Sequence, residues 1–290
     1  MATQEFLTQH NQLTLLRERL ANTYEEIEAR AVSMIRQGEV VDNPILTGEK
    51  QDTRYALATI AMITGRADMF CSQATAAVQQ VEPDMRVVPD GFRHVTLQLN
   101  FSRQGRRSIL VDAKVARAYY EALRQQFSSS GKPIRLELLR VLPTIDQEQA
   151  SVSVVGAFLP VDDMRIIEVR RQVRHAAEQS GLPLVGRLGE IRVIFSTLGR
   201  LPHPPRREGE TAPLLDAIDH INGQIPKACD TVIEMVDILS TTRISYMGLD
   251  KHIFMEPSLS LVKPNRAVKP RFVSATQKNL LDKVRLTRSP

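Results

Sequence analysis

The sequence predicts a mixed fold of helices and strands that is built from two similar halves. Three observations predict it: a short motif strand at 93–97, a similar stretch at 195–200, and the same order of elements around both. In each half the hydrophobic pattern reads strand, helix, motif strand, helix, strand. An internal repeat of this kind indicates a duplication, so we expect the two halves to share one design.

The flanking elements have nearly the same spacing in both halves. Apolar runs predict strands, and longer segments with apolar residues on one side predict helices. The first half should contain a strand at 55–63, helices at 67–81 and 112–127, and a strand at 134–142; the second half should contain a strand at 152–158, helices at 162–179 and 212–222, and a strand at 231–239. A hairpin partner at 243–249 and a further strand at 253–255 should follow.

The first motif strand carries a histidine and a threonine two positions apart. Residues at this spacing on a strand point to the same side, so His94 and Thr96 should share one face. Val95 and Leu97 should then face the packed side. An imidazole can give or take a proton and a hydroxyl can bind an oxyanion, and together they favour phosphate chemistry.

The second motif keeps this frame with one change. In the stretch FSTLGR at 195–200, Thr197 corresponds to Thr96, and Phe195 stands where the first motif has His94. The pair of motifs, with its matching flanks, resembles the 2H phosphoesterase superfamily of 2′-5′ RNA ligase-like and 2′,3′-cyclic phosphodiesterase proteins. The resemblance covers roughly 54–256, and the Leu-Gly-Arg ending of the second motif is common in that family.

The resemblance implies a fold and a site. The fold would be a duplicated, two-lobed α+β domain with antiparallel sheets flanked by helices around a central cleft. The catalytic residues would be His94, as general acid or base, with the hydroxyls of Thr96 and Thr197 holding the phosphate. The reaction needs no metal, and no cofactor is implied. Candidate substrate-binding residues are Phe195, Ser196, Arg200, Arg103 and Arg106.

Phenylalanine at the second histidine position leaves more than one function open. A lost general acid or base lowers a rate by about 10²–10⁴-fold, which favours a protein that binds a nucleotide or RNA-end phosphate with weak or absent turnover. The alternative is an active phosphodiesterase in which His94 works with a residue outside the motifs. His203, on the proline-rich loop after the second motif, and Tyr246 are the candidates for that substitute. A third possibility is a scaffold whose cleft is filled by its own N-terminal helix.

The regions before and after the motifs have a different character. Residues 1–50 should form a helical extension and linker that packs on the domain, covers the cleft or contacts a second copy. Residues 51–261 should form the phosphoesterase-like domain. Residues 262–290 hold eight basic residues against one acidic residue, whereas the whole chain carries a net charge of +5. Such a tail is expected on the surface, where it would add attraction to RNA.

Composition points to a cytoplasmic protein. Cys71 and Cys229 are the only cysteines, and their separation fits neither a metal site nor a disulfide framework. The N-terminus lacks a targeting pattern, and the sequence has no apolar run of about 18 residues, so no membrane partner is expected. The oligomeric state does not follow from the sequence.

Overall fold

The structure is a computed structural model, and it describes residues 2–50, 55–102, 113–128, 131–146, 150–182, 193–207, 212–241, 252–267, 269–274 and 278. Within these residues the fold is α+β. The helices are α1 (Ala2–Gln37), α2 (Gly65–Val81), α3 (Ala113–Gln126), α4 (Arg165–Gln179) and α5 (Pro213–Asn222). The strands are β1 (Tyr55–Met62), β2 (Arg86–Val87), β3 (His94–Ser102), β4 (Ile134–Ile145), β5 (Val152–Pro160), β6 (Phe195–Arg200), β7 (Asp230–Ile233), β8 (Met235–Thr241), β9 (His252–Ser260) and β10 (Arg271–Ser274).

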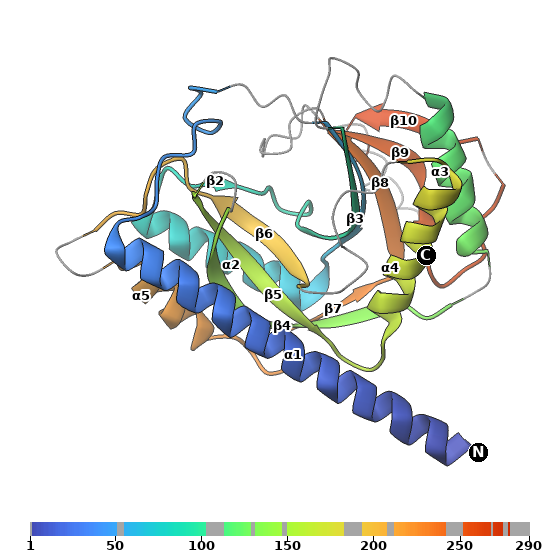
Figure 1. The fold of residues 1–290 in the computed structure, drawn as a ribbon, viewed down its shortest axis with the longest axis horizontal. Helices are drawn as coiled ribbons and strands as arrows, with labels where there is room; N and C mark the ends of the chain where they lie inside the picture. Colours follow the sequence, from blue (N-terminus) through green and yellow to red (C-terminus); the bar gives the residue numbers. More distant parts are fainter. Residues whose placement is uncertain are drawn as a thin grey trace.

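The described strands form one antiparallel sheet rather than two (Figure 1). Their order is β10-β9-β8-β1-β3-β6-β5-β4-β7, with β2 paired to β6. The two halves of the sequence exchange their last strands across this sheet, because β4 from the first half pairs with β5 and β8 from the second half pairs with β1. We call β1, β3, β8, β9 and β10 the first lobe, and β2, β4, β5, β6 and β7 the second lobe. Each lobe therefore contains elements of both halves.

The two motif strands lie next to each other at the centre of the sheet. Their register pairs Val95 of β3 with Ser196 of β6, and both side chains are buried. Opposite residues in an antiparallel pair share a face, and their neighbours along each strand point to the other face. Four half-buried side chains therefore lie together on this second face, which we call the motif face: His94, Thr96, Phe195 and Thr197.

Helix α1 covers the motif face of the second lobe. Arg140 lies across β5 from Phe195, because both pair with Ala157, and so it is also on the motif face. Glu28 of α1 forms a 2.5 Å ion pair with Arg140. The buried apolar residues of α1 recur at steps of four and seven, as expected for a helix with one packed side. They are Leu13, Leu20, Tyr24, Ala31 and Ile35.

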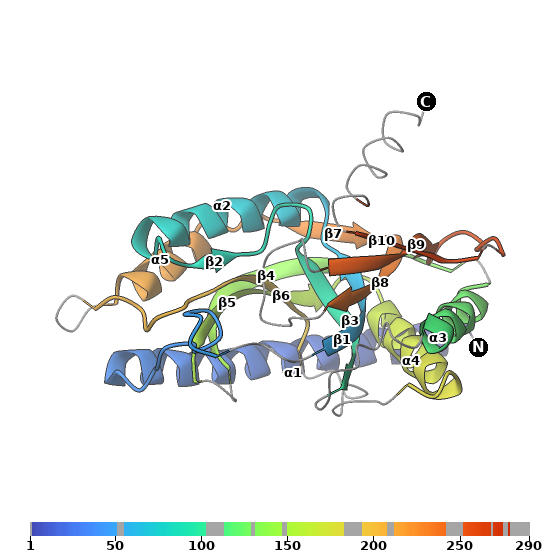
Figure 2. The same ribbon diagram turned by 90° about the horizontal axis from the view of Figure 1, so that it is seen from above.

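The other helices cover the opposite face. Ile60 of β1 pairs with Thr96 and therefore lies on the motif face. The preceding residue, Thr59, points to the other face, where it hydrogen-bonds Tyr119 of α3. Helices α3 and α4 therefore pack behind the first lobe, and α2 and α5 pack behind the second. In Figure 2, α3 and α4 nevertheless lie on the same side of the sheet as α1, and α2 and α5 lie on the other side. The sheet twists between its lobes, so the motif face points in different directions in the two lobes.

The ends of several helices have local causes. The Asp163 carboxylate, just before α4, accepts a hydrogen bond from the N–H of Arg165, the first residue of that helix. Pro213 begins α5, where the missing N–H has no cost. Pro83 follows the last turn of α2 and cannot continue it. No helix among the described residues has an apolar stretch long enough to cross a bilayer.

The predicted strand at 231–239 is two strands, which corrects the sequence analysis. The chain pairs with β4 up to Ile233, with β9 from Met235 and with β1 from Asp237, so it crosses from the second lobe to the first at Glu234. The run is mostly apolar in both strands, and hydrophobicity alone does not reveal a change of partner. The predicted strand at 243–249 lies outside the described residues.

Part of the segment after Leu261 is folded onto the sheet. Strand β10 lies within the segment predicted as a basic tail, and it pairs with β9 at the edge of the sheet. Lys278, farther along the same segment, is buried. The basic composition of this segment suggested a surface tail, but β10 and Lys278 belong to the folded domain.

Candidate functional site

His94 is the first residue of β3, and its ring is held in one tautomer. Its Nδ1 lies 2.8 Å from the carbonyl oxygen of Phe92. A carbonyl oxygen only accepts, so Nδ1 carries the proton and Nε2 is the acceptor nitrogen. Burial lowers the pKa of His94, and the hydrogen bond to Phe92 and the charge of Asp237 offset this only in part. The neutral imidazole is suited to accept a proton.

Arg93 fixes the start of β3. Its side chain is fully buried, and its guanidinium forms ion pairs with Asp68 at 2.8 Å and with Asp90 at 2.7 Å. Burial by itself would lower the pKa of Arg93, but the two carboxylates outweigh it and raise that pKa. Arg93 thus ties the strand that carries His94 to α2. The sequence pattern around the first motif predicted no role for this arginine.

The threonines and the remaining motif positions follow from the register. Because β3 and β6 run in opposite directions around the pair of Val95 and Ser196, Thr197 lies beside His94 and Phe195 lies beside Thr96. The imidazole and the two hydroxyls therefore occupy neighbouring positions on the motif face. Together they can accept a proton and donate two hydrogen bonds to an anion.

Phe195 is packed against α1. Its ring centroid lies 5.2 Å from that of Tyr24, at an interplanar angle of 34°. The Tyr24 hydroxyl donates to the carbonyl oxygen of Phe158 at 2.8 Å and accepts from the N–H of Ile194 at 2.9 Å. Burial raises the pKa of Tyr24, so its hydroxyl keeps its proton at neutral pH. Tyr24 therefore holds α1 on the sheet and supplies no proton-transfer group at this position.

Arg170 of α4 joins the two motif strands from behind. Its Nη2 donates to the carbonyl oxygen of Thr96 at 3.0 Å and its Nη1 to that of Val193 at 3.2 Å. Burial lowers the pKa of Arg170 to about 10, which still leaves it charged at neutral pH. No carboxylate of the described residues pairs with it. Arg170 lies on the buried side of α4, next to Val169 and Val173. An arginine among buried apolar residues of a helix could have identified it from the sequence as a buried charge.

Ser196, a candidate substrate contact, faces away from the motif face. It is buried opposite Val95, because the alternation that places Phe195 and Thr197 on one side places Ser196 on the other. Arg200 ends β6, where it pairs in register with Arg86 and Ser153.

His203 contacts the segment that follows α1. It follows the end of β6, and its Nδ1 lies 3.0 Å from a carboxylate oxygen of Asp42 in the segment after α1. Arg103, Arg106 and Tyr246 lie outside the described residues.

The glycine of the second motif has a packing role. A Cβ atom at Gly199 would lie 2.8 Å from the sulfur of Met85, which is closer than such atoms approach. Strand β2 follows Met85 directly and pairs with β6 at this point. Glycine is therefore needed here for close packing, whatever the motif face binds.

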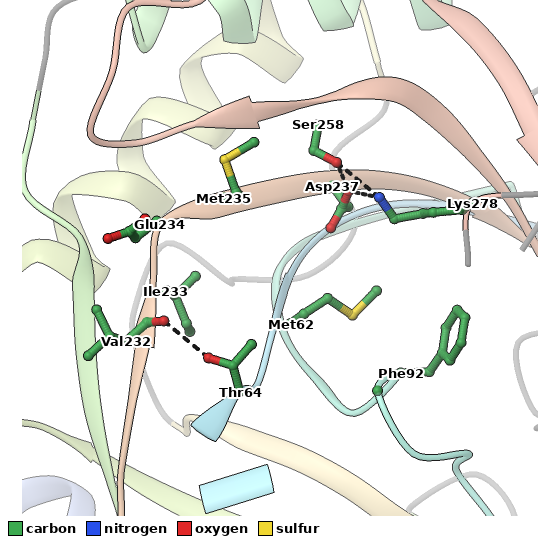
Figure 3. A pocket seen from close by; sticks show the side chains of 11 residues that line it. Met62, Thr64, Phe92, Val232, Ile233, Glu234, Met235, Asp237, Ser258 and Lys278 are labelled. Carbon is green, nitrogen blue, oxygen red and sulfur yellow. Dashed lines mark hydrogen bonds and ion pairs between the residues drawn. The ribbon is translucent and has the colours of Figure 1, made fainter. Parts of the chain in front are cut away.

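A pocket of about 540 Å³ opens on the first lobe beside His94 (Figure 3). Met62 and Phe92 line this pocket, and both contact the first motif. Met62 pairs in register with His94, and the carbonyl oxygen of Phe92 accepts the hydrogen bond of the His94 ring. Its polar end is formed by Asp237, Ser258 and Lys278. The lining residues are Met62, Thr64, Gly91, Phe92, Val232, Ile233, Glu234, Met235, Asp237, Ser258 and Lys278.

No protein-family model and no curated protein matches this sequence. Solved structures do match. TT0787 of Thermus thermophilus is 13% identical, with 72% of this chain and 100% of that chain covered at a TM-score of 0.47. Escherichia coli LigT in complex with 3′-AMP is 12% identical, covering 77% and 95% at a TM-score of 0.41. Usb1 of Kluyveromyces marxianus is 10% identical, covering 63% and 92% at a TM-score of 0.37.

Proposed function

We propose that this chain is a degenerate 2H phosphoesterase-like protein that binds the phosphate of a nucleotide or an RNA end on its motif face, with weak or absent turnover. One observation supports this function above all. The register of β3 and β6 puts His94, Thr96 and Thr197 on one face, and the fourth position on that face is Phe195. Phosphate-binding groups are thus retained where one proton-transfer group is missing.

The chemistry of the four positions supports binding more than hydrolysis. A phosphodiester reaction needs one group to accept a proton from the nucleophile and another to protonate the leaving oxygen. His94, held neutral with Nε2 as acceptor, suits the first task. Phe195 cannot perform the second, and the Tyr24 hydroxyl beside it is engaged by two backbone groups. The loss is expected to be about 10²–10⁴-fold in rate.

The position of α1 narrows the class of ligand. This helix packs over the second-lobe part of the motif face, where Tyr24 covers Phe195. A ligand would therefore reach the threonines from the first-lobe side. Such an approach suits a terminal or cyclic phosphate better than an RNA strand that runs across both lobes.

The test is calorimetric binding of 3′-AMP and of 2′,3′-cyclic AMP to the full chain. We expect Thr96→Ala and Thr197→Ala each to weaken binding by about tenfold or more, because a hydrogen bond to a charged group contributes ~1.5–3 kcal/mol. Thr144→Ala is the matched control, since Thr144 is a half-buried threonine of β4 in the second lobe. Absence of binding at millimolar ligand, or equal loss in all three variants, would contradict the proposed function.

Hydrolysis is the second candidate function, and the acceptor nitrogen of His94 is the observation that favours it. The same preparations can be assayed for hydrolysis of 2′,3′-cyclic AMP. We expect turnover at or near the background rate. Brisk turnover that disappears in His94→Ala would instead identify an active phosphodiesterase with an acid outside the two motifs.

A further inference from the structure

The polar end of the pocket holds a primary ammonium group with all of its hydrogen-bond donors engaged. The Nζ of Lys278 lies 2.9 Å from Asp237, 2.8 Å from Glu256 and 2.9 Å from the hydroxyl of Ser258. A primary ammonium has three N–H donors, and here three oxygen atoms from three side chains surround it. Its remaining side faces the ring of Phe254, whose centroid is 5.3 Å away.

The sheet, and not the segment that carries Lys278, builds this site. Asp237 belongs to β8, and the other two oxygens and the ring come from β9. The register of the two strands shifts here, so that residues 256–258 lie opposite Asp237 alone. Such a bulge re-aims side chains, and it places Glu256 and Ser258 on the same side as Asp237. The acceptors are therefore positioned by strand pairing.

The electrostatics of the site require a cation. Asp237 and Glu256 are both buried, and burial of a negative charge is costly unless a positive charge lies beside it. Burial by itself would lower the pKa of the Lys278 ammonium, but the carboxylates of Asp237 and Glu256 outweigh it and raise that pKa. The lysine is therefore charged, and it is held by its charge and by its three donors.

The site also has an opening. Asp237, Ser258 and Lys278 line the pocket of about 540 Å³, and Figure 3 shows the Lys278 ammonium pointing at the other two from one side of that space. Met62 and Phe92 form nearby walls that can contact an alkyl chain. A ligand with an ammonium head and a short apolar body would match these surroundings.

We propose that this end of the pocket is a specific binding site for a primary ammonium group, which Lys278 fills in the wild type and which a free primary amine can fill when the Lys278 side chain is removed. The inference is independent of phosphate binding on the motif face. A quaternary ammonium would be rejected because it has no N–H donors, and a neutral alcohol because it leaves the two carboxylates uncompensated.

The test is chemical rescue of the full-length variant Lys278→Ala. The atoms removed by this substitution are those of n-propylamine, so n-propylammonium chloride is the probe. We expect the variant to melt roughly 6–12 °C below the wild type, as for a broken buried ion pair in a domain of this size. Propylammonium at tens of millimolar should raise its melting temperature by about 2–4 °C above the effect of equal sodium chloride.

Five controls isolate the site. Propylammonium should not stabilise the wild type, in which Lys278 already fills the site, or Lys278→Met, in which a side chain of similar length blocks it. Lys269→Ala, which removes an exposed lysine of the same segment, should melt like the wild type. Propanol and tetramethylammonium should not rescue Lys278→Ala. If that variant fails to fold, its refolding with propylammonium, followed by circular dichroism, is the equivalent measurement.

The position of the bound amine can be read from labelled methionine methyl groups. On titration of Lys278→Ala with propylammonium, the signals of Met62 and Met235, which line the pocket, should shift. The signal of Met69, an exposed residue of α2, should not. Rescue that is equal for sodium and propylammonium, or that leaves the two pocket methyl groups unchanged, would overturn the proposal and make Lys278 a structural ion pair only.

Discussion

At position 195 a phenyl ring stands where the first half of the chain carries His94. The ring lies against Tyr24, so restoring an imidazole would place it under α1 rather than in open space. We therefore expect Phe195→His to leave hydrolysis of 2′,3′-cyclic AMP at the wild-type level. The lost apolar contact should lower the free energy of unfolding by about 1–3 kcal/mol.

A phosphodiesterase assay and a urea titration of Phe195→His check this expectation. Phe195→Leu is the matched control, because it shortens the side chain without adding a titratable group. Turnover that appears in Phe195→His and disappears when His94→Ala is added would show that α1 leaves the motif face open. That result would also favour the descent of this chain from an enzyme with two histidines.

The pKa of His94 predicts how stability depends on pH. Burial holds that pKa below the ordinary 6.5 in the folded state. The unfolded state then binds more protons as the pH falls through 6.5, so the free energy of unfolding should decrease towards acid. Urea titrations at about pH 5 and about pH 8 should show a larger decrease for the wild type than for His94→Gln, which cannot titrate at this position. An equal decrease in both proteins would mean that His94 is accessible to protons in the folded state.

Among the elements, α1 has the largest effect on what the motif face can do. The Tyr24 hydroxyl fixes this helix to the sheet through two hydrogen bonds, one to the carbonyl oxygen of Phe158 in β5 and one from the N–H of Ile194 just before β6. Two ion pairs flank it, from Arg17 to Glu137 and from Glu28 to Arg140. A helix held in this way is part of the core and not a surface appendage.

Tyr24→Phe isolates the contribution of that hydroxyl. The ring contact with Phe195 remains, but a buried N–H and a buried carbonyl lose their partner. We expect the free energy of unfolding to fall by about 1–3 kcal/mol, measured by urea denaturation. Binding of 3′-AMP should be unchanged, because the threonines are not touched. A protein as stable as the wild type would indicate that water replaces the hydroxyl.

For the molecule as a whole, the basic residues that the structure describes after β9 differ in burial. Lys278 is buried in its carboxylate site, and it cannot bind RNA at the same time. Lys263, Arg266 and Lys269 are exposed. If these three contact RNA phosphates, changing all of them to Gln should lower the salt dependence of single-stranded RNA binding by about 2 in log–log slope, at ~0.7 per contact.

Fluorescence anisotropy at several salt concentrations measures this slope. The matched control changes three exposed arginines of α1 to Gln, namely Arg19, Arg30 and Arg36. Equal losses in both triple variants would mean that RNA responds to net charge alone. Binding of 3′-AMP should be the same in all of these proteins, since none of the changed residues lies on the motif face.

Local patterns in the sequence determined most of the elements and the direction of the motif side chains. The period-two alternation around Val95 places His94 and Thr96 on one face, and the same alternation around Ser196 places Phe195 and Thr197 together. The duplication and the α+β class followed from the order of apolar runs. These features depend on neighbours along the chain, which a sequence displays directly.

Tertiary structure alone decided which strands pair and which charges are buried. The exchange of β4 and β8 between the halves, and the break at Glu234, depend on partners distant in sequence. Packing between helices and the sheet decides that α1 covers Phe195 and that Arg170 lies behind the motif strands. From the sequence alone, a lysine in a basic segment is expected to be exposed to solvent. Lys278 is buried because Asp237 and Glu256, brought together by strand pairing, compensate its charge.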